Sequence, residues 1–520
     1  MAPNPPVMLS WSVILATLAA SVAVAGFAIS NQSYWIDEAV SLIVATAATP
    51  AEAWHYMLRV EGSTIQMPIY QAYLFLWHKA FGISEWAMRA SNIPWFVFGQ
   101  LGYLVMLRHR PRVALVSAGL AAVCPMVWAY LDEARPYLMQ YAAACWMVGA
   151  LVRFAAPVRS TARDGRITPP SVSPPELAAL ALAFVFLYSS SLLGSLWAMS
   201  MLAALVLLVF FGQISMPPSR SARWCVAAPT LAAVLAISLY YAWTISWVRG
   251  GYYLPGATLL SIPYIAYELL GFGGLGAGKI ALRHDLTASL AESAGGILPL
   301  AICYFSLGVF AALKIRIPRD RPRAALTVLA WAAAIVVPGL LIYVALSISG
   351  YRALPRHYIP ALPALITALG FLITAAMRQK RLVWRVCALA LPVLWLISSA
   401  NLRWQAGHAK DDYRAASAIA KATLNQGLDV WWGADASAAF VYRTPVSLEK
   451  MPGRAWAMQA PSWDLIRFKF PPHVIVLSKP DIYDPHGAIA RYAAENQFTP
   501  ALTLQAFTIF TRHGEPVPQL

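Results

Sequence analysis

Charged residues are scarce in this sequence. Only 12% of its 520 residues are charged, whereas hydrophobic residues make up 59%. A soluble protein carries about 25% charged residues, because its surface must face water. The composition therefore excludes an ordinary soluble protein, and it equally excludes a disordered or fibrous one. We expect a polytopic α-helical membrane protein, most of whose surface faces lipid.

Cysteine is also rare, since the chain has only five: Cys124, Cys145, Cys225, Cys303 and Cys387. All of them lie in or beside apolar runs, and no CxxC spacing occurs. This pattern excludes a disulfide framework and a cysteine-based metal site, so we expect small core residues.

Acidic residues are fewer than basic ones, 23 against 39, and the formal net charge is +16. A nucleic-acid-binding surface would need a contiguous basic patch with interleaved aromatic residues. Here the basic residues gather instead in short gaps between apolar runs, which is typical of cytoplasmic loops, and we expect no nucleic-acid partner. The gaps contain Arg108, Arg110 and Arg112; Arg153, Arg159, Arg163 and Arg166; Arg220 and Arg223; Lys314, Arg316, Arg319, Arg321 and Arg323; and Arg378, Lys380, Arg381 and Arg385.

The apolar runs predict about eleven transmembrane helices, at about 20 residues per span. The first run is too long for a signal-peptide core and lacks a basic start, so we expect it to be retained. An odd number of spans puts the termini on opposite sides of the inner (plasma) membrane, and the basic gaps then place the N-terminus in the cytoplasm and the C-terminus outside. The expected spans are 9–30, 91–107, 113–131, 136–152, 177–190, 192–212, 225–247, 294–313, 324–348, 358–377 and 382–401.

Two domains are expected from this map. Residues 1–401 form the transmembrane domain, with long outer loops at 31–90 and 248–293. Residues 402–520 alternate helical and strand periodicity, which indicates a small extracytoplasmic α/β domain. Its expected helices are 413–424 and 487–496, and its expected strands are 428–432, 473–477 and 502–511.

Two acidic pairs reach the outer face at membrane depth. Asp37 and Glu38 follow the first helix, and Asp132 and Glu133 begin the second outer loop, shortly before Arg135. Helix capping and ion pairing would explain such residues structurally. Ionisable groups at a membrane edge are costly, however, so a functional role is the working hypothesis.

Several motifs around these acids resemble a known family. Their order along the chain is similar to that of the GT-C glycosyltransferases, and most of all to the clan of protein O-mannosyltransferases and lipid A aminoarabinose transferases. Gln66-Met67 departs from the family pattern, in which His or Pro is frequent. The matching segments are Tyr34 to Ala39, Gln66 to Tyr70, Gly82 to Arg89, Ala134 to Tyr137, and Arg356 to Tyr358 with Pro360 and Pro363.

The resemblance implies a GT-C fold and an inverting transfer on the outer face of the membrane. A sugar carried on a polyprenyl phosphate would move to a hydroxyl of a glycan, lipid or protein acceptor. The resemblance favours Asp37 as the base, and general-base assistance contributes roughly 10²–10⁴-fold to a rate. Glu38 is then left to hold the loop or an arginine.

The donor phosphate calls for cationic groups on the outer side. Arg135, Arg249, Lys279, Arg352 and Arg356 are the candidates, with Tyr358 as a hydrogen-bond donor. An arginine offers a planar fork to phosphate oxygens. The alternative for each cation is snorkelling to lipid headgroups.

A second charged pair has a structural interpretation. Glu85 and Arg89 lie four residues apart in an expected helix, and we interpret them as an i,i+4 pair.

A glycine-rich stretch at 271–276 fits GxGxxG, and 273–279 fits a P-loop until Ile280. No strand precedes it, so the structural context for nucleotide binding is wrong. We expect a flexible loop that orders over a lipid phosphate.

No cofactor is expected. The acids at 37, 38, 132 and 133 could imitate the divalent-cation site of oligosaccharyltransferases. The matched clan resembles metal-independent enzymes, and a cation needs several oxygen ligands at one point, so we expect no metal.

The main alternative is a polytopic secondary transporter or an export component for a lipid or glycan. Transporters place charged residues near the bilayer midplane. Here the acids gather at one face instead, which favours the transferase.

Overall fold

The computed structural model describes residues 8–59, 63–155, 171–217, 219–245, 257–314, 322–447, 451–457 and 471–512. The chain divides into two compact units. The helical unit comprises residues 1–29, 65–73 and 89–408, and the mixed unit comprises residues 30–64, 74–88 and 409–520.

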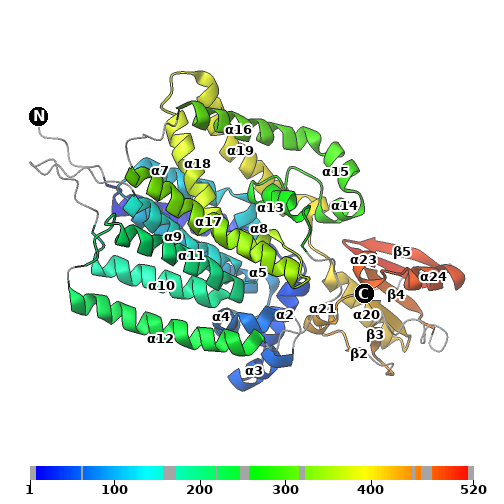
Figure 1. The fold of residues 1–520 in the computed structure, drawn as a ribbon. Coiled ribbons are helices and arrows are strands. Elements are labelled where there is room, and N and C mark those ends of the chain that lie inside the picture. Colours follow the sequence, from blue (N-terminus) through cyan, green and yellow to red (C-terminus); the bar gives the residue numbers. More distant parts are fainter. Residues whose placement is uncertain are drawn as a thin grey trace, which may run out of the picture. The chain divides into compact units, whose positions relative to one another are not determined.

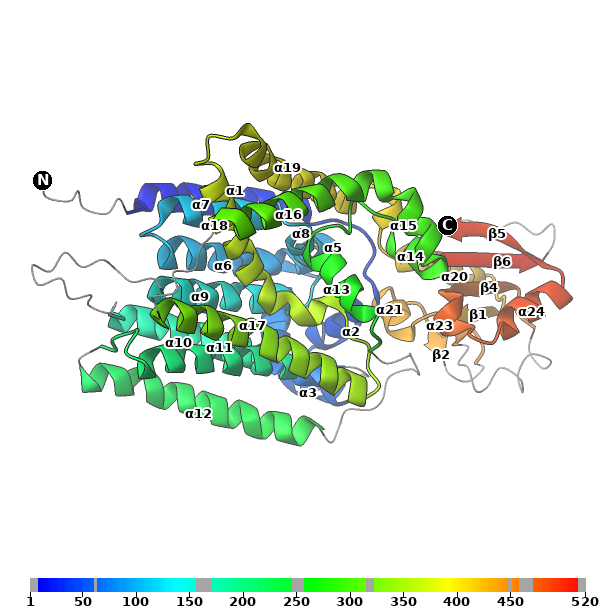
Figure 2. The same ribbon diagram turned by 45° about the horizontal axis from the view of Figure 1, so that its top comes forward.

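The helical unit is a bundle in which α10, α11 and α12 run side by side (Figures 1 and 2). Its helices are α1 (Trp11–Ala28), α6 (Asn92–Met106), α7 (Pro111–Ala122), α8 (Pro125–Leu131), α9 (Tyr137–Ala155), α10 (Pro174–Ser190), α11 (Leu192–Phe210), α12 (Arg220–Ile245), α13 (Ser261–Leu269), α14 (Lys279–His284), α15 (Leu286–Glu292), α16 (Ala294–Lys314), α17 (Pro322–Ile348), η2 (Pro355–Ala361), α18 (Leu362–Ala376), α19 (Leu382–Trp404) and η3 (Ala406–His408). Three further helices are η1 (Ser63–Gln66), α4 (Pro68–Phe81) and α5 (Glu85–Ala90).

Seven helices in the described ranges are long and apolar enough to cross a membrane, or up to eight if the bent pair α7–α8 is one span. This pair bends by 56°, at a point where Pro125 begins the second helix and interrupts the hydrogen-bond ladder. The chain is therefore a polytopic helical membrane protein.

Each of the eleven expected stretches holds a helix or the bent pair, but α6, α9 and α10 are not among the candidate spans. The count of eleven stays a prediction.

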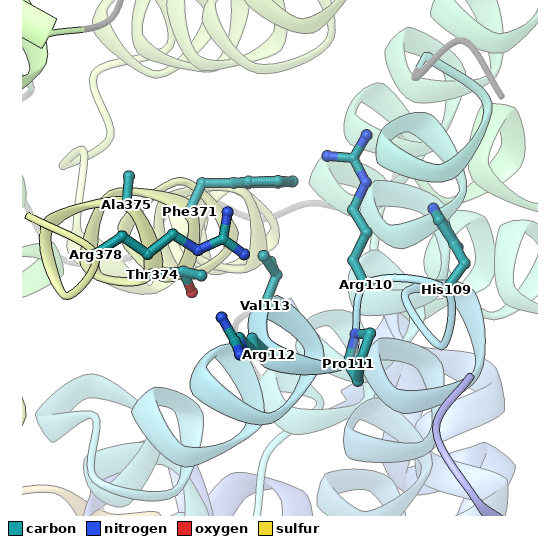
Figure 3. A pocket seen from close by; sticks show the side chains of 9 residues that line it. All are labelled: His109, Arg110, Pro111, Arg112, Val113, Phe371, Thr374, Ala375 and Arg378. Carbon is teal, nitrogen blue, oxygen red and sulfur yellow. The ribbon is translucent and has the colours of Figure 1, made fainter. Parts of the chain in front are cut away.

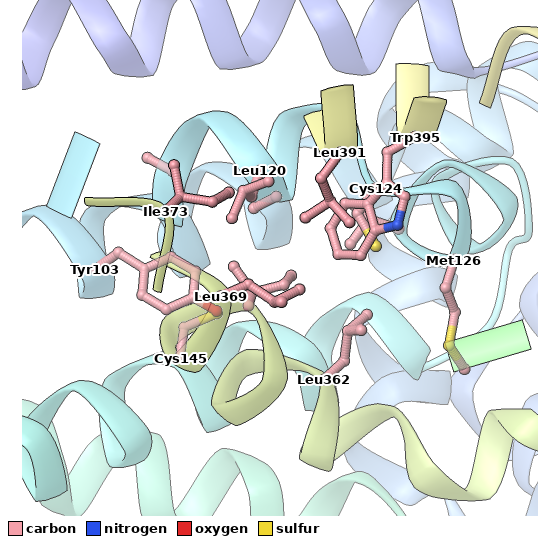
Figure 4. Packing of buried hydrophobic residues seen from close by; sticks show 14 of the residues in the cluster. Tyr103, Leu120, Cys124, Met126, Cys145, Leu362, Leu369, Ile373, Leu391 and Trp395 are labelled. Atoms are coloured by element: carbon pink, nitrogen blue, oxygen red, sulfur yellow. The ribbon is translucent and has the colours of Figure 1, made fainter. Parts of the chain in front are cut away.

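The core of the helical unit forms where α6, α7, α18 and α19 meet. Figure 4 shows Tyr103, Leu120, Leu369, Ile373 and Leu391 packed together, and all five are buried. The close approach of α18 to α7 depends on a glycine. A methyl group at Gly370 would lie 2.4 Å from the Ser117 hydroxyl oxygen, so a larger residue would push the helices apart.

The mixed unit contains a six-stranded sheet in the order β2-β3-β1-β4-β6-β5. The strands β2, β3, β1 and β4 are parallel, while β6 runs antiparallel to both β4 and β5. Its elements are α2 (Ile36–Ala45), α3 (Pro50–Arg59), α20 (Tyr413–Asn425), β1 (Val430–Gly433), α21 (Ala436–Val441), β2 (Val446–Ser447), β3 (Ala455–Ala457), β4 (Val474–Ser478), α23 (Pro480–Tyr483), α24 (Ala488–Glu495), β5 (Phe498–Leu504) and β6 (Phe507–Arg512).

Each face of this sheet has its own core, because successive side chains of a strand point to opposite faces. Trp432 of β1 packs in a cluster with residues of α20 and α21, whereas Trp431 packs with residues of α23 and α24. Ala39 of α2 belongs to the first cluster. Residues of the loop expected at 31–90 therefore fold with the C-terminal segment, and the boundary lies at 408/409, where the sequence predicted 401/402.

Candidate functional site

Glu38 is fully buried in the first turn of α2. Its Oε2 accepts a hydrogen bond from the Trp35 backbone N–H at 3.3 Å and lies 3.2 Å from the ammonium group of Lys410. One carboxylate thus fixes the entry of the chain into α2 and neutralises a lysine. Lys410 was not among the residues that the sequence singled out.

Asp37 has different surroundings. Its side chain is half-buried, and its negative charge acts on Asp435, whose pKa is raised to about 6, mainly by burial and in smaller part by Asp37. Asp435 caps α21, since its Oδ1 accepts the Ala438 N–H at 3.0 Å. The packing of α2 on α21 therefore brings two carboxyl groups into mutual influence. Asp435 was not predicted as a site residue from the sequence. The available signal was its position as a helix N-cap directly before Ala436.

The loop before α2 is held by Tyr442. The Tyr442 hydroxyl accepts the Tyr34 N–H at 2.7 Å and donates to Glu85 Oε1 at 2.9 Å. Arg414 pairs with the same carboxylate oxygen at 2.9 Å. Burial raises the pKa of Tyr442 to about 12, so its hydroxyl stays protonated as this network requires. Glu85 is thus engaged by Arg414, whereas an i,i+4 pair with Arg89 had been expected.

The turn between α8 and α9, in the helical unit, is fixed by Asn92. Its side-chain amide donates to the carbonyls of Tyr130, Leu131 and Glu133 at 3.1, 3.2 and 2.6 Å. The fully buried Arg89 lies 3.8 Å from Asp132, measured from Nε to Oδ1. Asp132 therefore has a structural partner.

Arg135 belongs to the same turn and is nearly buried, with 3% of its surface exposed. Its guanidinium lies over the Tyr137 ring at 6.0 Å from the centroid. This environment suits a packed residue as well as one that binds a ligand.

A set of charged groups surrounds Lys279 at the start of α14. Burial alone lowers the pKa of Lys279, but Glu268, Tyr264 and Glu133 outweigh it and raise that pKa above its usual value, while Arg356 opposes them. Lys279 as a whole residue is nevertheless exposed, although its charged group has buried surroundings. The structure thus brings together Lys279, Arg356 and Glu133.

Two members of this set were not predicted from the sequence. Burial raises the pKa of Glu268, and Lys279 partly opposes that shift. Burial lowers the pKa of His408, and Lys279 lowers it further. Glu268 is one of the few acids of the 248–293 loop, and this scarcity was the signal that could have identified it.

The remaining candidates differ in accessibility. Arg352 is half-buried just before η2. Tyr358 is only 9% exposed, and its ring packs at 6.4 Å from that of Trp197, whose indole N–H donates to the His357 carbonyl at 3.0 Å. Arg249 lies outside the described residues.

The glycine-rich stretch packs tightly on α19. The Gly274 N–H donates to the Ser398 hydroxyl at 3.1 Å, and that hydroxyl donates to the Gly271 carbonyl at 2.7 Å. A methyl group at Gly274 would lie 1.9 Å from the Ser398 carbonyl oxygen. The expectation of a flexible loop is therefore wrong for residues 271–278, whose glycines permit this close approach.

Within the described ranges, no group of three or more His, Cys, Asp or Glu side chains lies close enough to hold a metal ion. The cysteines are all unpaired, and only Cys225 is exposed.

No family model and no curated protein matches the sequence. Solved structures do match the fold. ArnT from Cupriavidus metallidurans, solved bound to undecaprenyl phosphate, is 13% identical, with a TM-score of 0.50 over 98% of this chain and 100% of its own. The oligosaccharyltransferase AglB from Archaeoglobus fulgidus, in complex with an inhibitory peptide and a dolichol-phosphate, is 12% identical, with a TM-score of 0.43 over 97% of this chain and 75% of its own. The expected resemblance is confirmed at the level of the fold: this chain has the GT-C fold represented by ArnT.

Proposed function

We propose that this protein is an inverting glycosyltransferase that moves a hexose or pentose from a polyprenyl phosphate to a hydroxyl of a glycan, lipid or protein. The observation that carries the proposal is the exposed Lys279, grouped with Arg356 and Glu133, in a chain with the fold of ArnT. Lipid-phosphate binding calls for such cations. The undecaprenyl phosphate in the ArnT structure supports the same donor class here.

Arg356 and Lys279 are the proposed ligands of the donor phosphate, which is also the leaving group. As the bond from the sugar to the phosphate breaks, negative charge grows on the phosphate, and preorganised cations stabilise that charge. Glu133 and Glu268 would position and partly neutralise the cations until the donor binds. Arg135, Arg249, Arg352 and Tyr358 are proposed as further contacts.

Asp37 is the proposed general base. The acceptor hydroxyl attacks the anomeric carbon from the face opposite the phosphate, so the configuration inverts. Its proton passes to the Asp37 carboxylate, and the polyprenyl phosphate leaves with the electron pair of the broken bond. Glu38 is engaged by Trp35 and Lys410, which supports a structural role for Glu38 beside the proposed base.

The proposed location is the inner (plasma) membrane, with eleven spans, a cytoplasmic N-terminus and the mixed unit on the outer side. The basic gaps of the sequence support this orientation through the positive-inside rule.

The proposal is tested with purified protein in detergent, using polyprenyl-phosphate pentoses and hexoses with envelope lipids as acceptors. Mass spectrometry should detect free polyprenyl phosphate and a glycosylated acceptor. A carrier moves a lipid between compartments and has no activity in detergent, so transfer under these conditions distinguishes the two classes. No transfer from any donor, together with lipid flipping in vesicles, would support the transporter. Glycan and lipid profiles of cells lacking this chain would then identify the sugar.

A further inference from the structure

A cavity of about 710 Å³ opens in the helical unit between the start of α7 and the end of α18. One wall consists of residues 109–113, which form the turn before α7 and the start of that helix. The other wall consists of Phe371, Thr374 and Ala375 of α18 and of Arg378 just after it. Figure 3 shows the guanidinium groups of Arg110, Arg112 and Arg378 bordering this space. None of these residues belongs to the set proposed above for the donor phosphate.

The cavity follows from the way the two helices pack. Gly370 lets α18 approach α7 closely at Ser117. Val113 lies one turn before Ser117, and Thr374 lies one turn after Gly370, so the cavity begins just beyond the close contact. The Thr374 hydroxyl is used within α18, since it donates to the Gly370 carbonyl at 2.7 Å. The polar groups that remain in the wall are mainly cationic.

The lining carries positive charge without acids, because no carboxylate is among the described residues that line it. Arg110 lies over the Phe371 ring at 5.2 Å from the centroid, so this guanidinium is held at the wall. The pKa of His109 is lowered to about 4, mainly by burial and in smaller part by Arg110, Arg153 and Arg108. The neighbouring arginines therefore make the local electrostatic potential positive. Such a field attracts an anion, which gains charge-assisted hydrogen bonds from guanidinium groups.

We infer that this cavity is a second anion site, which binds the phosphate of an anionic phospholipid headgroup. Guanidinium forks suit phosphate oxygens, and the volume lies in the range of small-molecule sites. Phe371, Val113 and Ala375 supply an apolar wall for the glycerol part of the lipid. The arginines come from two of the basic gaps, 108–112 and 378–385, that the sequence places at one membrane surface.

The test measures retention of dioleoylphosphatidylglycerol by the purified full-length protein, using native mass spectrometry after titration in neutral detergent. The variants are Arg112→Gln and the double variant Arg110→Gln with Arg378→Gln. Arg385→Gln is the matched control, because it removes an exposed arginine of the same basic gap that does not line the cavity. Dioleoylphosphatidylcholine, which has no net charge, is the control lipid, and thermal unfolding checks that each variant is folded.

The wild type and Arg385→Gln should retain one phosphatidylglycerol saturably, and the double variant should bind it at least 10-fold more weakly. Arg112 is exposed, so Arg112→Gln should weaken binding without disturbing the fold even if the double variant does not fold. Displacement by millimolar glycerol phosphate would show that the phosphate alone suffices, whereas no displacement would show that the whole lipid is needed. Equal binding by all variants, or equal binding of the neutral lipid, would overturn the inference.

Discussion

Asp37 and Glu38 illustrate how two neighbouring carboxylates in one helical turn acquire different roles. Glu38 is fully buried and engaged by Lys410 and the Trp35 N–H, whereas Asp37 stays half-buried and interacts with Asp435. Residues one apart on a helix point about 100° from each other. The contacts of Glu38 therefore secure the fold, and Asp37 is the acid that we propose as the general base.

A prediction at the scale of residues concerns the binding of the donor phosphate by Arg356. Arg356→Ala should weaken binding of undecaprenyl phosphate about 10- to 100-fold, since losing a hydrogen bond to a charged group costs about 1.5–3 kcal/mol. Arg356→Lys should recover only part of the affinity, because the planar fork is lost. Titration with undecaprenyl phosphate measures the affinities of the purified wild type, Arg356→Ala and Arg356→Lys, with Arg385→Ala as the control. Equal affinities would remove Arg356 from the site.

At the scale of elements, the position of α2 depends on Glu38. Glu38→Gln should lower the stability of the mixed unit by about 1–3 kcal/mol, because the Lys410 ammonium loses its charged partner. The thermal unfolding midpoint measures this loss, and Glu495→Gln, at an exposed position of α24, is the control. An unchanged midpoint would mean that the Glu38–Lys410 pair does not hold α2.

The N-cap of α21 gives a prediction for pH dependence. The pKa of Asp435 is raised to about 6 by burial, so the folded protein binds a proton that the unfolded chain, with a pKa of about 3.9, has already released. The contribution of this group to stability therefore falls as the pH rises from about 4 to 6.

Asp435→Asn should flatten the pH dependence of stability in that window, since Asn also caps helices well and carries no charge to bury. Thermal unfolding of both forms at several pH values between 4 and 7 is the measurement. Parallel curves for the two forms would show that Asp435 does not titrate as proposed.

At the scale of the whole molecule, local patterns predicted much of the fold. The break between α10 and α11 falls at Ser191, as the expected spans 177–190 and 192–212 predict, and α20 and β4 lie within one residue of their expected bounds. The expected strand 502–511 is instead two strands, β5 and β6. The turn at Gln505 and Ala506, where Ala506 has φ of +62°, contains no glycine to mark it.

The long-range groupings could not be predicted, because no local pattern encodes which distant residues meet. Asp435 lies almost 400 residues after Asp37 and interacts with it only because α2 packs on α21. The glycines at 271–276 looked like a mobile loop, but they serve packing on Ser398 of α19. Motif order singled out Asp37 and Arg356 as candidates, whereas the groupings of His408 with Lys279 and of Lys410 with Glu38 required the structure.

The topology gives a prediction for the whole chain. A reporter that is active only in the cytoplasm should be inactive when fused after Leu520, because the positive-inside rule places the C-terminus outside. The same reporter fused to the 378–385 basic gap should be active and serves as the control. Activity of the C-terminal fusion would contradict both the orientation and an outer-face reaction.

The central claim is that Asp37 assists sugar transfer from a lipid phosphate. The most direct test measures kcat and KM for transfer from a purified polyprenyl-phosphate sugar by the wild type, Asp37→Asn and Glu38→Gln. Asp37→Asn should lower kcat at least about 10²-fold with little change in KM, since the lost interaction acts mainly in the transition state. Glu38→Gln should keep more activity and lose stability instead. Normal turnover by Asp37→Asn would contradict the account.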